Sequence, residues 1–127
     1  MTTIRDIMTA NVISVRPESS VREALELLVK HKITGLPVID AERRIVGVLS
    51  EKDVLKAFYE DSPNVGALMT PNPETIAVDA PLVDVFDVLM ANSFRRILIH
   101  ENGKLVGLVS RSDLMPVVLE ALLDRIH

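Results

Sequence analysis

Apolar residues recur with a helical period at two places in the chain. Spacings of three and four between apolar side chains predict helices with one buried face over residues 21–29 and 82–90. Before the first helix, Ser19 or Ser20 is a candidate N-cap, with Glu23 placed to complete a capping box. Before the second helix, Pro81 suits the first helical turn. Both predicted helices therefore carry a start signal.

Short β-rich runs surround these two helices. One run precedes each helix and a pair of runs follows it, at residues 12–15, 36–39 and 45–49, and again at 75–78, 97–99 and 105–109. Asn102-Gly103 between the last two runs predicts a tight hairpin turn. Each half of the chain then closes with a helix, predicted over residues 51–60 and 111–126, the second with Pro116 in its first turns.

The two halves are copies of one motif. Residues 8–11 (MTAN) recur as 69–72 (MTPN), and residues 46–53 (VGVLSEKD) recur as 106–113 (VGLVSRSD). The offset is 61 residues at the first match and 60 at the second, so one residue has been lost in between. The turn at residues 40–44, against 101–104, is where such a loss is cheapest, because a deletion inside a strand would reverse its faces.

This order predicts an α/β (α+β) fold of two tandem β-α-β-β-α motifs, residues 1–61 and 62–127. A unit of this size buries too little apolar surface to be stable alone. We therefore expect the two motifs to pack sheet against sheet about a pseudo-twofold axis. That symmetry would create two related clefts, so paired sites are expected.

Composition narrows the classes of function. The formal net charge is -4, which gives no basic footprint for binding nucleic acid, and only 3% of residues are aromatic. Cysteine is absent, so disulfides, thiolate catalysis and cysteine-based zinc sites are excluded, and the three histidines share no spacing typical of a metal site. The sequence contains neither a signal-peptide pattern nor a long apolar run. A cytoplasmic location is the default expectation, with no membrane partner.

The repeated segments resemble the cystathionine-beta-synthase (CBS) domain family, arranged as a tandem pair or Bateman module. The resemblance spans residues 4–123. It rests on the Met-Thr start, on residues 33–40 (ITGLPVID), and on the Gly-apolar-apolar-Ser-x-x-Asp end of each copy. It implies a non-enzymatic regulatory module that binds an adenosine-containing ligand such as AMP, ADP, ATP, S-adenosylmethionine or NAD(H). It also implies a regulated enzyme, channel or transporter as partner, and requires no cofactor.

The resemblance also implies which residues form the clefts. An Asp at a helix start can accept hydrogen bonds from ribose hydroxyls, and a Ser before a helix N-terminus favours phosphate. One cleft would use Asn11, Ile13, Ile33, Thr34, Gly35, Ser110, Ser112 and Asp113. The other would use Asn72, Glu74, Phe94, Arg95, Arg96, Ser50, Lys52 and Asp53. Arginine suits phosphate, so Arg95 and Arg96 are candidates for either cleft.

The two expected clefts are not equivalent. In the second, Leu98 replaces the expected proline, His100 replaces an apolar residue, and Glu74 stands where Ile13 stands in the first. A carboxylate beside an adenine slot is not an obvious help. The cleft that contains Asp113 is therefore ranked as the better adenosine site.

Other interpretations of the same residues stay open. Each Ser-x-x-Asp segment could simply cap the helix that follows it, and the arginines could be solvated surface charges. The module could also serve only protein interaction or dimerisation, with no functional nucleotide site. A small hydrolase would need a base beside Ser50 or Ser110, and neither segment has a neighbouring histidine. The apolar last helix predicts a homodimer, since it carries more apolar surface than one layer of contacts can cover.

Overall fold

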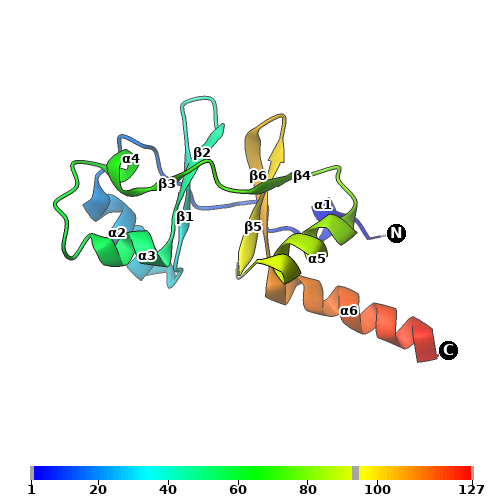
Figure 1. Ribbon diagram of the computed structural model, residues 1–127. Helices are drawn as coiled ribbons and strands as arrows, with labels where there is room; N and C mark the ends of the chain where they lie inside the picture. Colours follow the sequence, from blue (N-terminus) through cyan, green and yellow to red (C-terminus); the bar gives the residue numbers. More distant parts are fainter. Residues whose placement is uncertain (1, 93–94, 127) are drawn as a thin grey trace. The chain divides into compact units, whose positions relative to one another are not determined.

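The chain folds into two compact units (Figure 1). The computed structural model describes residues 2–92 and 95–126. We call Ile13–Pro73 the central unit, and Met1–Val12 together with Glu74–His127 the terminal unit, because the latter holds both ends of the sequence. Each unit contains one three-stranded sheet with helices, which confirms the predicted mixed α+β fold.

The central unit is built on an antiparallel sheet in the order β1-β2-β3. Its elements are α2 (Val21–His31), β1 (Leu36–Ile39), β2 (Ile45–Leu49), α3 (Glu51–Lys56), α4 (Val65–Leu68) and β3 (Thr70–Pro71). Its core is almost wholly aliphatic and comprises Val15, Ala24, Leu28, Leu36, Val38, Leu49, Val65 and Leu68.

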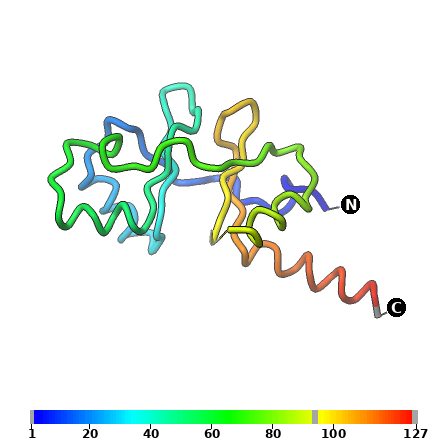
Figure 2. The backbone as a smooth tube through the Cα atoms, viewed as in Figure 1, coloured from blue at the N-terminus to red at the C-terminus, as the bar shows by residue number. Residues whose placement is uncertain are grey.

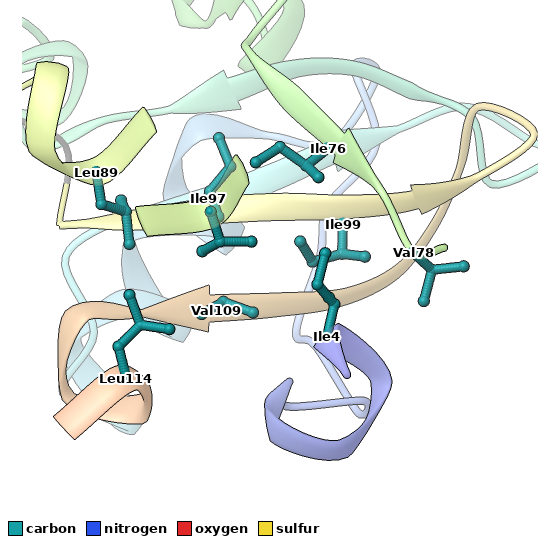
Figure 3. Close-up of a cluster of buried hydrophobic side chains, with 9 residues drawn as sticks. Ile4, Ile76, Val78, Leu89, Ile97, Ile99, Val109 and Leu114 are labelled. Atoms are coloured by element: carbon teal, nitrogen blue, oxygen red, sulfur yellow. The ribbon is translucent and has the colours of Figure 1, made fainter. Parts of the chain in front are cut away.

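The terminal unit is built on a mixed sheet in the order β4-β5-β6, in which β4 runs parallel to β5 and β6 antiparallel to it. Its elements are α1 (Ile4–Ile7), β4 (Thr75–Ala77), α5 (Leu82–Ala91), β5 (Arg96–Glu101), β6 (Lys104–Ser110) and α6 (Arg111–Ile126). Figure 3 shows side chains from the sheet, α1, α5 and α6 converging on one core, formed by Ile4, Ile76, Val78, Val85, Leu89, Ile97, Ile99, Val109 and Leu114.

Local signals located most elements correctly. Ser20, rather than Ser19, caps α2 and accepts a hydrogen bond from the Glu23 backbone N–H at 3.0 Å. Asn102 and Gly103 have φ angles of 54° and 82°, as a tight hairpin between β5 and β6 requires. The turn where the repeats differ in length is held by Asp40, whose Oδ1 accepts from the backbone N–H of Glu42 and Arg44.

Two predicted elements are shorter than expected. The run at 12–15 makes only an isolated parallel bridge, Val15 with Val38, because Pro17 has no N–H with which to continue the pairing. The helix predicted over 51–60 ends at Lys56, because the backbone N–H groups of residues 57–59 bond to carbonyls three residues back, which replaces the α-helical pattern by tighter turns.

The first segment of each repeat pairs with the last strand of the other repeat. Thr9 exchanges two backbone hydrogen bonds with Leu108, at 2.8 and 3.0 Å, and Thr70 pairs with Val48. Figure 2 accordingly shows the N-terminal segment, in blue, beside the chain's second half within the terminal unit. Each compact unit therefore lacks the first segment of its own predicted repeat (1–61 or 62–127). In its place it contains the corresponding segment of the other repeat, residues 62–73 in the central unit and 1–12 in the terminal unit.

A methionine–glycine contact explains why these two segments recur together. A Cβ added at Gly107 would lie 2.3 Å from Met8 Sδ, and one at Gly47 would lie 2.4 Å from Met69 Sδ. Both distances are far below van der Waals contact, so only glycine leaves room for the methionine. Methionine fills irregular gaps of this kind well. The Met-Thr and Gly-x-x-Ser signatures are therefore two sides of one packing contact.

Candidate functional site: the two Ser-x-x-Asp turns

The Ser-x-x-Asp turn of the central unit is a complete capping box. Ser50 Oγ accepts from the Asp53 backbone N–H at 3.2 Å, and Asp53 Oδ2 accepts from the Ser50 backbone N–H at 2.9 Å. Ser50 Oγ also donates to Asp53 Oδ2 at 2.9 Å. This turn begins α3, so the capping interpretation is confirmed for Ser50 and Asp53.

Thr70 adds a further donor to the same carboxylate. Its hydroxyl lies 3.2 Å from Oδ1 and 3.0 Å from Oδ2 of Asp53. Asp53 is only 4% exposed and is the buried charged residue of the described core. Among the described residues, the hydrogen-bond partners of this carboxylate, Ser50 and Thr70, belong to the central unit, so the unit itself stabilises the charge.

The Ser-x-x-Asp turn of the terminal unit is more open. Asp113 Oδ2 accepts from the Ser110 backbone N–H at 2.8 Å and from Ser110 Oγ at 3.0 Å. Ser112 Oγ lies 2.8 Å from Ser110 Oγ, so the two hydroxyls form a pair at the start of α6. Asp113 is half-buried, and within residues 2–92 and 95–126 its Oδ1 has no hydrogen-bond partner.

Arg95 and Arg96 lie next to this second turn. Arg96 is paired with Ser110 across β5 and β6, and the Arg95 carbonyl accepts from the Arg111 backbone N–H at 3.1 Å. The position equivalent to Arg96 in the other repeat is Gly35, where an added Cβ would lie 3.0 Å from the Leu49 carbonyl oxygen. Where the terminal unit has Arg95 and Arg96 beside the Ser110 turn, the equivalent positions of the other repeat are therefore Thr34 and Gly35.

The remaining predicted residues divide between the two units. Asn11 shares the terminal unit with Ser110, Ser112 and Asp113, as do Arg95 and Arg96. The central unit holds Ser50, Lys52 and Asp53 together with Asn72, Ile13, Ile33, Thr34 and Gly35. Glu74 belongs to the terminal unit, and Phe94 lies outside the described residues. The assembly of two clefts from both units stays a prediction.

Two residues at these turns were missed at the level of sequence. Thr70 contacts Asp53, and the only advance signal was the recurrence of Met-Thr in both repeats. Arg111 Nη2 lies 3.4 Å from the carbonyls of Leu89 and Asn92, so its guanidinium reaches the C-terminal end of α5, where positive charge is favourable. Nothing in the sequence predicted that long-range contact.

The described residues include neither a cluster of metal ligands nor a helix that could span a membrane. Residues 2–92 and 95–126 contain no group of three or more His, Asp or Glu side chains that could hold a metal ion. His100 instead accepts from the Gly103 backbone N–H through Nδ1 at 3.1 Å, inside the hairpin. None of the described helices is both long and apolar enough to span a bilayer.

Comparison with known proteins identifies the family. The model of the CBS domain matches the chain twice, over residues 4–60 and 65–120, and the chain belongs to this family as a tandem pair. It is 35% identical over 123 residues to an uncharacterized 17.7 kDa protein of Acidianus ambivalens, covering 94% of this chain and 74% of that one. It is 37% identical over 138 residues to CBSX1, a chloroplastic CBS domain-containing protein of Arabidopsis thaliana. That match covers 84% of this chain but 58% of CBSX1, so the chain spans little more than half of that relative.

Solved structures agree with the family and the fold. A crystal structure of CBSX2 in complex with AMP superposes with a TM-score of 0.84 at 37% identity, covering 95% of this chain and 98% of that one. The CBS domain pair of protein MJ0100, in complex with 5′-methylthioadenosine and S-adenosyl-L-methionine, superposes with a TM-score of 0.79 at 25% identity, covering 92% and 99%. Relatives of this fold therefore bind adenosine-containing molecules.

Proposed function

We propose that the chain is a regulatory module that binds an adenosine-containing ligand and thereby modulates a partner protein, without catalysing a reaction itself. The observation that carries the proposal is the Asp113 carboxylate, which is held by Ser110 through one oxygen and keeps the other oxygen without a partner among the described residues. The AMP complex of CBSX2, 37% identical to this chain, supports the choice of ligand.

The chemistry of the Ser110 turn suits a nucleotide. A carboxylate oxygen that is already oriented can accept hydrogen bonds from ribose hydroxyls at little further ordering cost. The hydroxyls of Ser110 and Ser112 stand at the N-terminus of the 16-residue α6, where the helix dipole favours an anion. Arg95 and Arg96 flank the same turn and match phosphate geometry. Ribose and phosphate would thus be bound by adjacent residues.

The same contacts argue against hydrolysis. A nucleophilic serine needs a base that takes its proton, and in serine hydrolases that base is held in turn by a third group. Ser50 and Ser110 each donate their hydroxyl to the carboxylate of their own turn. The same carboxylate oxygens also accept from the serine backbone N–H, and among the described residues no histidine is hydrogen-bonded to either serine, so the arrangement favours capping and binding over catalysis.

Dimerisation is the second part of the proposal. Leu114, near the start of α6, is buried, whereas Met115, Leu119 and Leu123 are 67%, 59% and 49% exposed. Val118 and Leu122 on the same helix are also exposed. An apolar helix face of this extent is expected to be covered by a second copy of the chain. A ligand that prefers one arrangement of such a dimer would then shift its population.

A thermal-shift panel tests the ligand proposal. AMP, ATP, S-adenosylmethionine and NADH are added to wild type, Asp113→Ala and, as a matched control, Asp124→Ala, an exposed carboxylate further along α6. A ligand that binds the folded state raises the melting temperature by mass action. We expect a rise for wild type and Asp124→Ala that is lost in Asp113→Ala. If none of the four compounds stabilises wild type, the interaction-module alternative is favoured instead.

A further inference from the structure

We infer that Thr70 acts as a latch that closes the Ser50 turn to ribose, so that the chain binds one adenosine-containing ligand rather than two. The inference rests on the proposed function. It attributes the difference in ligand binding between the Ser50 turn and the Ser110 turn to one hydroxyl group, that of Thr70. The evidence is the difference between two carboxylates that the sequence repeat makes equivalent, Asp53 and Asp113.

The Thr70 hydroxyl lies against the carboxylate oxygen that a ribose would need. Oδ2 of Asp53 already accepts from the backbone N–H and the hydroxyl of Ser50, at 2.9 Å each. Oδ1, the oxygen left over, accepts from Thr70 at 3.2 Å, and the same hydroxyl reaches Oδ2 at 3.0 Å. Because Asp53 is only 4% exposed, a ribose hydroxyl would have to displace Thr70 to reach the Asp53 carboxylate.

The equivalent residue in the other repeat makes no such contact. Thr9 matches Thr70 in the repeated Met-Thr segment and pairs with Leu108, as Thr70 pairs with Val48. Among the residues that the structure describes, however, no hydrogen bond joins Thr9 to Asp113. The repeat therefore supplies a hydroxyl at both places and engages it at only one.

The two threonines also differ in the residue that follows them. Thr70 precedes Pro71, and a residue before proline is confined to extended backbone conformations. Thr70 and Pro71 form the short strand β3, which pairs with Val48 and Gly47 of β2. Thr9 precedes Ala10 and makes a single isolated bridge. The backbone that carries the Thr70 hydroxyl is thus the more restricted of the two.

Titration calorimetry with AMP tests the latch. We expect wild type to bind one AMP per chain, with binding lost in Asp113→Ala and kept in Asp53→Ala. Thr70→Val keeps the size and β-branching of the side chain but removes the donor, and we expect it to bind two AMP per chain. The second equivalent should disappear in the double variant Thr70→Val/Asp53→Ala. Thr70→Ser, which keeps a hydroxyl, should bind one.

Thr9→Val is the matched control and should leave the stoichiometry at one. The latch is overturned if wild type binds two AMP per chain, or if Thr70→Val remains folded by circular dichroism and still binds one. Those results leave the proposed function standing, provided that binding depends on Asp113. If AMP does not bind, ATP, S-adenosylmethionine and NADH are titrated in its place, and absence of binding of all four to both wild type and Thr70→Val overturns the ligand proposal and the latch together. If Thr70→Val does not fold, Thr70→Ala is titrated in its place, and a single bound AMP per folded chain again refutes the latch.

Discussion

The contact between Met8 and Gly107 gives the sharpest quantitative prediction, because it joins the N-terminal segment to the last strand of the sheet. In Gly107→Ala, the new Cβ would lie 2.3 Å from Met8 Sδ, 2.9 Å from Met8 Cγ and 3.1 Å from the Thr9 carbonyl oxygen. The methionine must leave its position, and the backbone oxygen cannot move as freely. Overpacking of this kind costs about 1–3 kcal/mol. At this chain length that corresponds to a fall in melting temperature of about 4 °C per kcal/mol.

A double-mutant cycle isolates the contact. Met8→Ala alone should cost about 1–2 kcal/mol, less than a fully buried methionine, because Met8 is half-buried. In the double variant Met8→Ala/Gly107→Ala, the added methyl group occupies space that the methionine has vacated. We therefore expect the double variant to be about 1–2 kcal/mol more stable than the sum of the single effects predicts. Urea unfolding followed by circular dichroism measures the four free energies.

The control for this cycle is a crossed pair. Gly107→Ala combined with Met69→Ala joins residues of different units and should be additive within about 0.5 kcal/mol. Gly47→Ala with Met69→Ala should instead show the same rescue, since its Cβ would lie 2.4 Å from Met69 Sδ. If the energies of both matched pairs are additive, the methionine–glycine packing contact is not the reason why the Met-Thr and Gly-x-x-Ser signatures recur together.

Three further predictions follow from the same contacts. Asp53→Ala should lower the unfolding free energy by about 1–3 kcal/mol, because it leaves the Ser50 N–H and the Thr70 hydroxyl without their acceptor, whereas Asp113→Ala should lower it by about 1 kcal/mol. Urea denaturation compares the two variants, and equal losses of stability would contradict the buried, fully bonded state of Asp53. Leu119→Asp should shift the mass measured by light scattering from dimer to monomer without loss of circular dichroism, and an unchanged mass would remove α6 from the interface. Gly103→Val should destabilise the chain by about 1 kcal/mol or more, because a β-branched residue resists a φ of 82°, and an unchanged melting temperature would contradict that turn geometry.

The elements that rest on local signals could be predicted from the sequence. The apolar periodicity of α2 and α5 spans only a few turns, and the φ angles at Asn102-Gly103 follow from two adjacent residues. The capping role of Ser50 and Asp53 was also readable, because a capping box involves residues only three positions apart.

The contacts that distinguish the two turns could not be predicted in this way. Thr70 lies 17 residues from Asp53, and Arg111 reaches Leu89 across 22 residues, so both contacts depend on how strands pair. The two repeats place Asp53 and Asp113 at equivalent positions, and the sequence distinguished their clefts only by neighbouring residues, whereas in the structure one carboxylate is buried and the other half-buried. Sequence similarity between repeats identifies candidate residues, whereas tertiary packing decides which of them remain available.

Discrimination between AMP and 2′,3′-dideoxy-AMP by wild type and Asp113→Ala tests the central claim most directly. If the free oxygen of Asp113 accepts a hydrogen bond from the sugar, removing the sugar hydroxyls should weaken binding to wild type about 10- to 100-fold, the range for a hydrogen bond to a charged group. In Asp113→Ala the residual affinity, measured at far higher nucleotide concentrations than the titrations above, should be nearly equal for the two nucleotides. A wild-type protein that fails to distinguish them, or a variant that still does, would contradict the account.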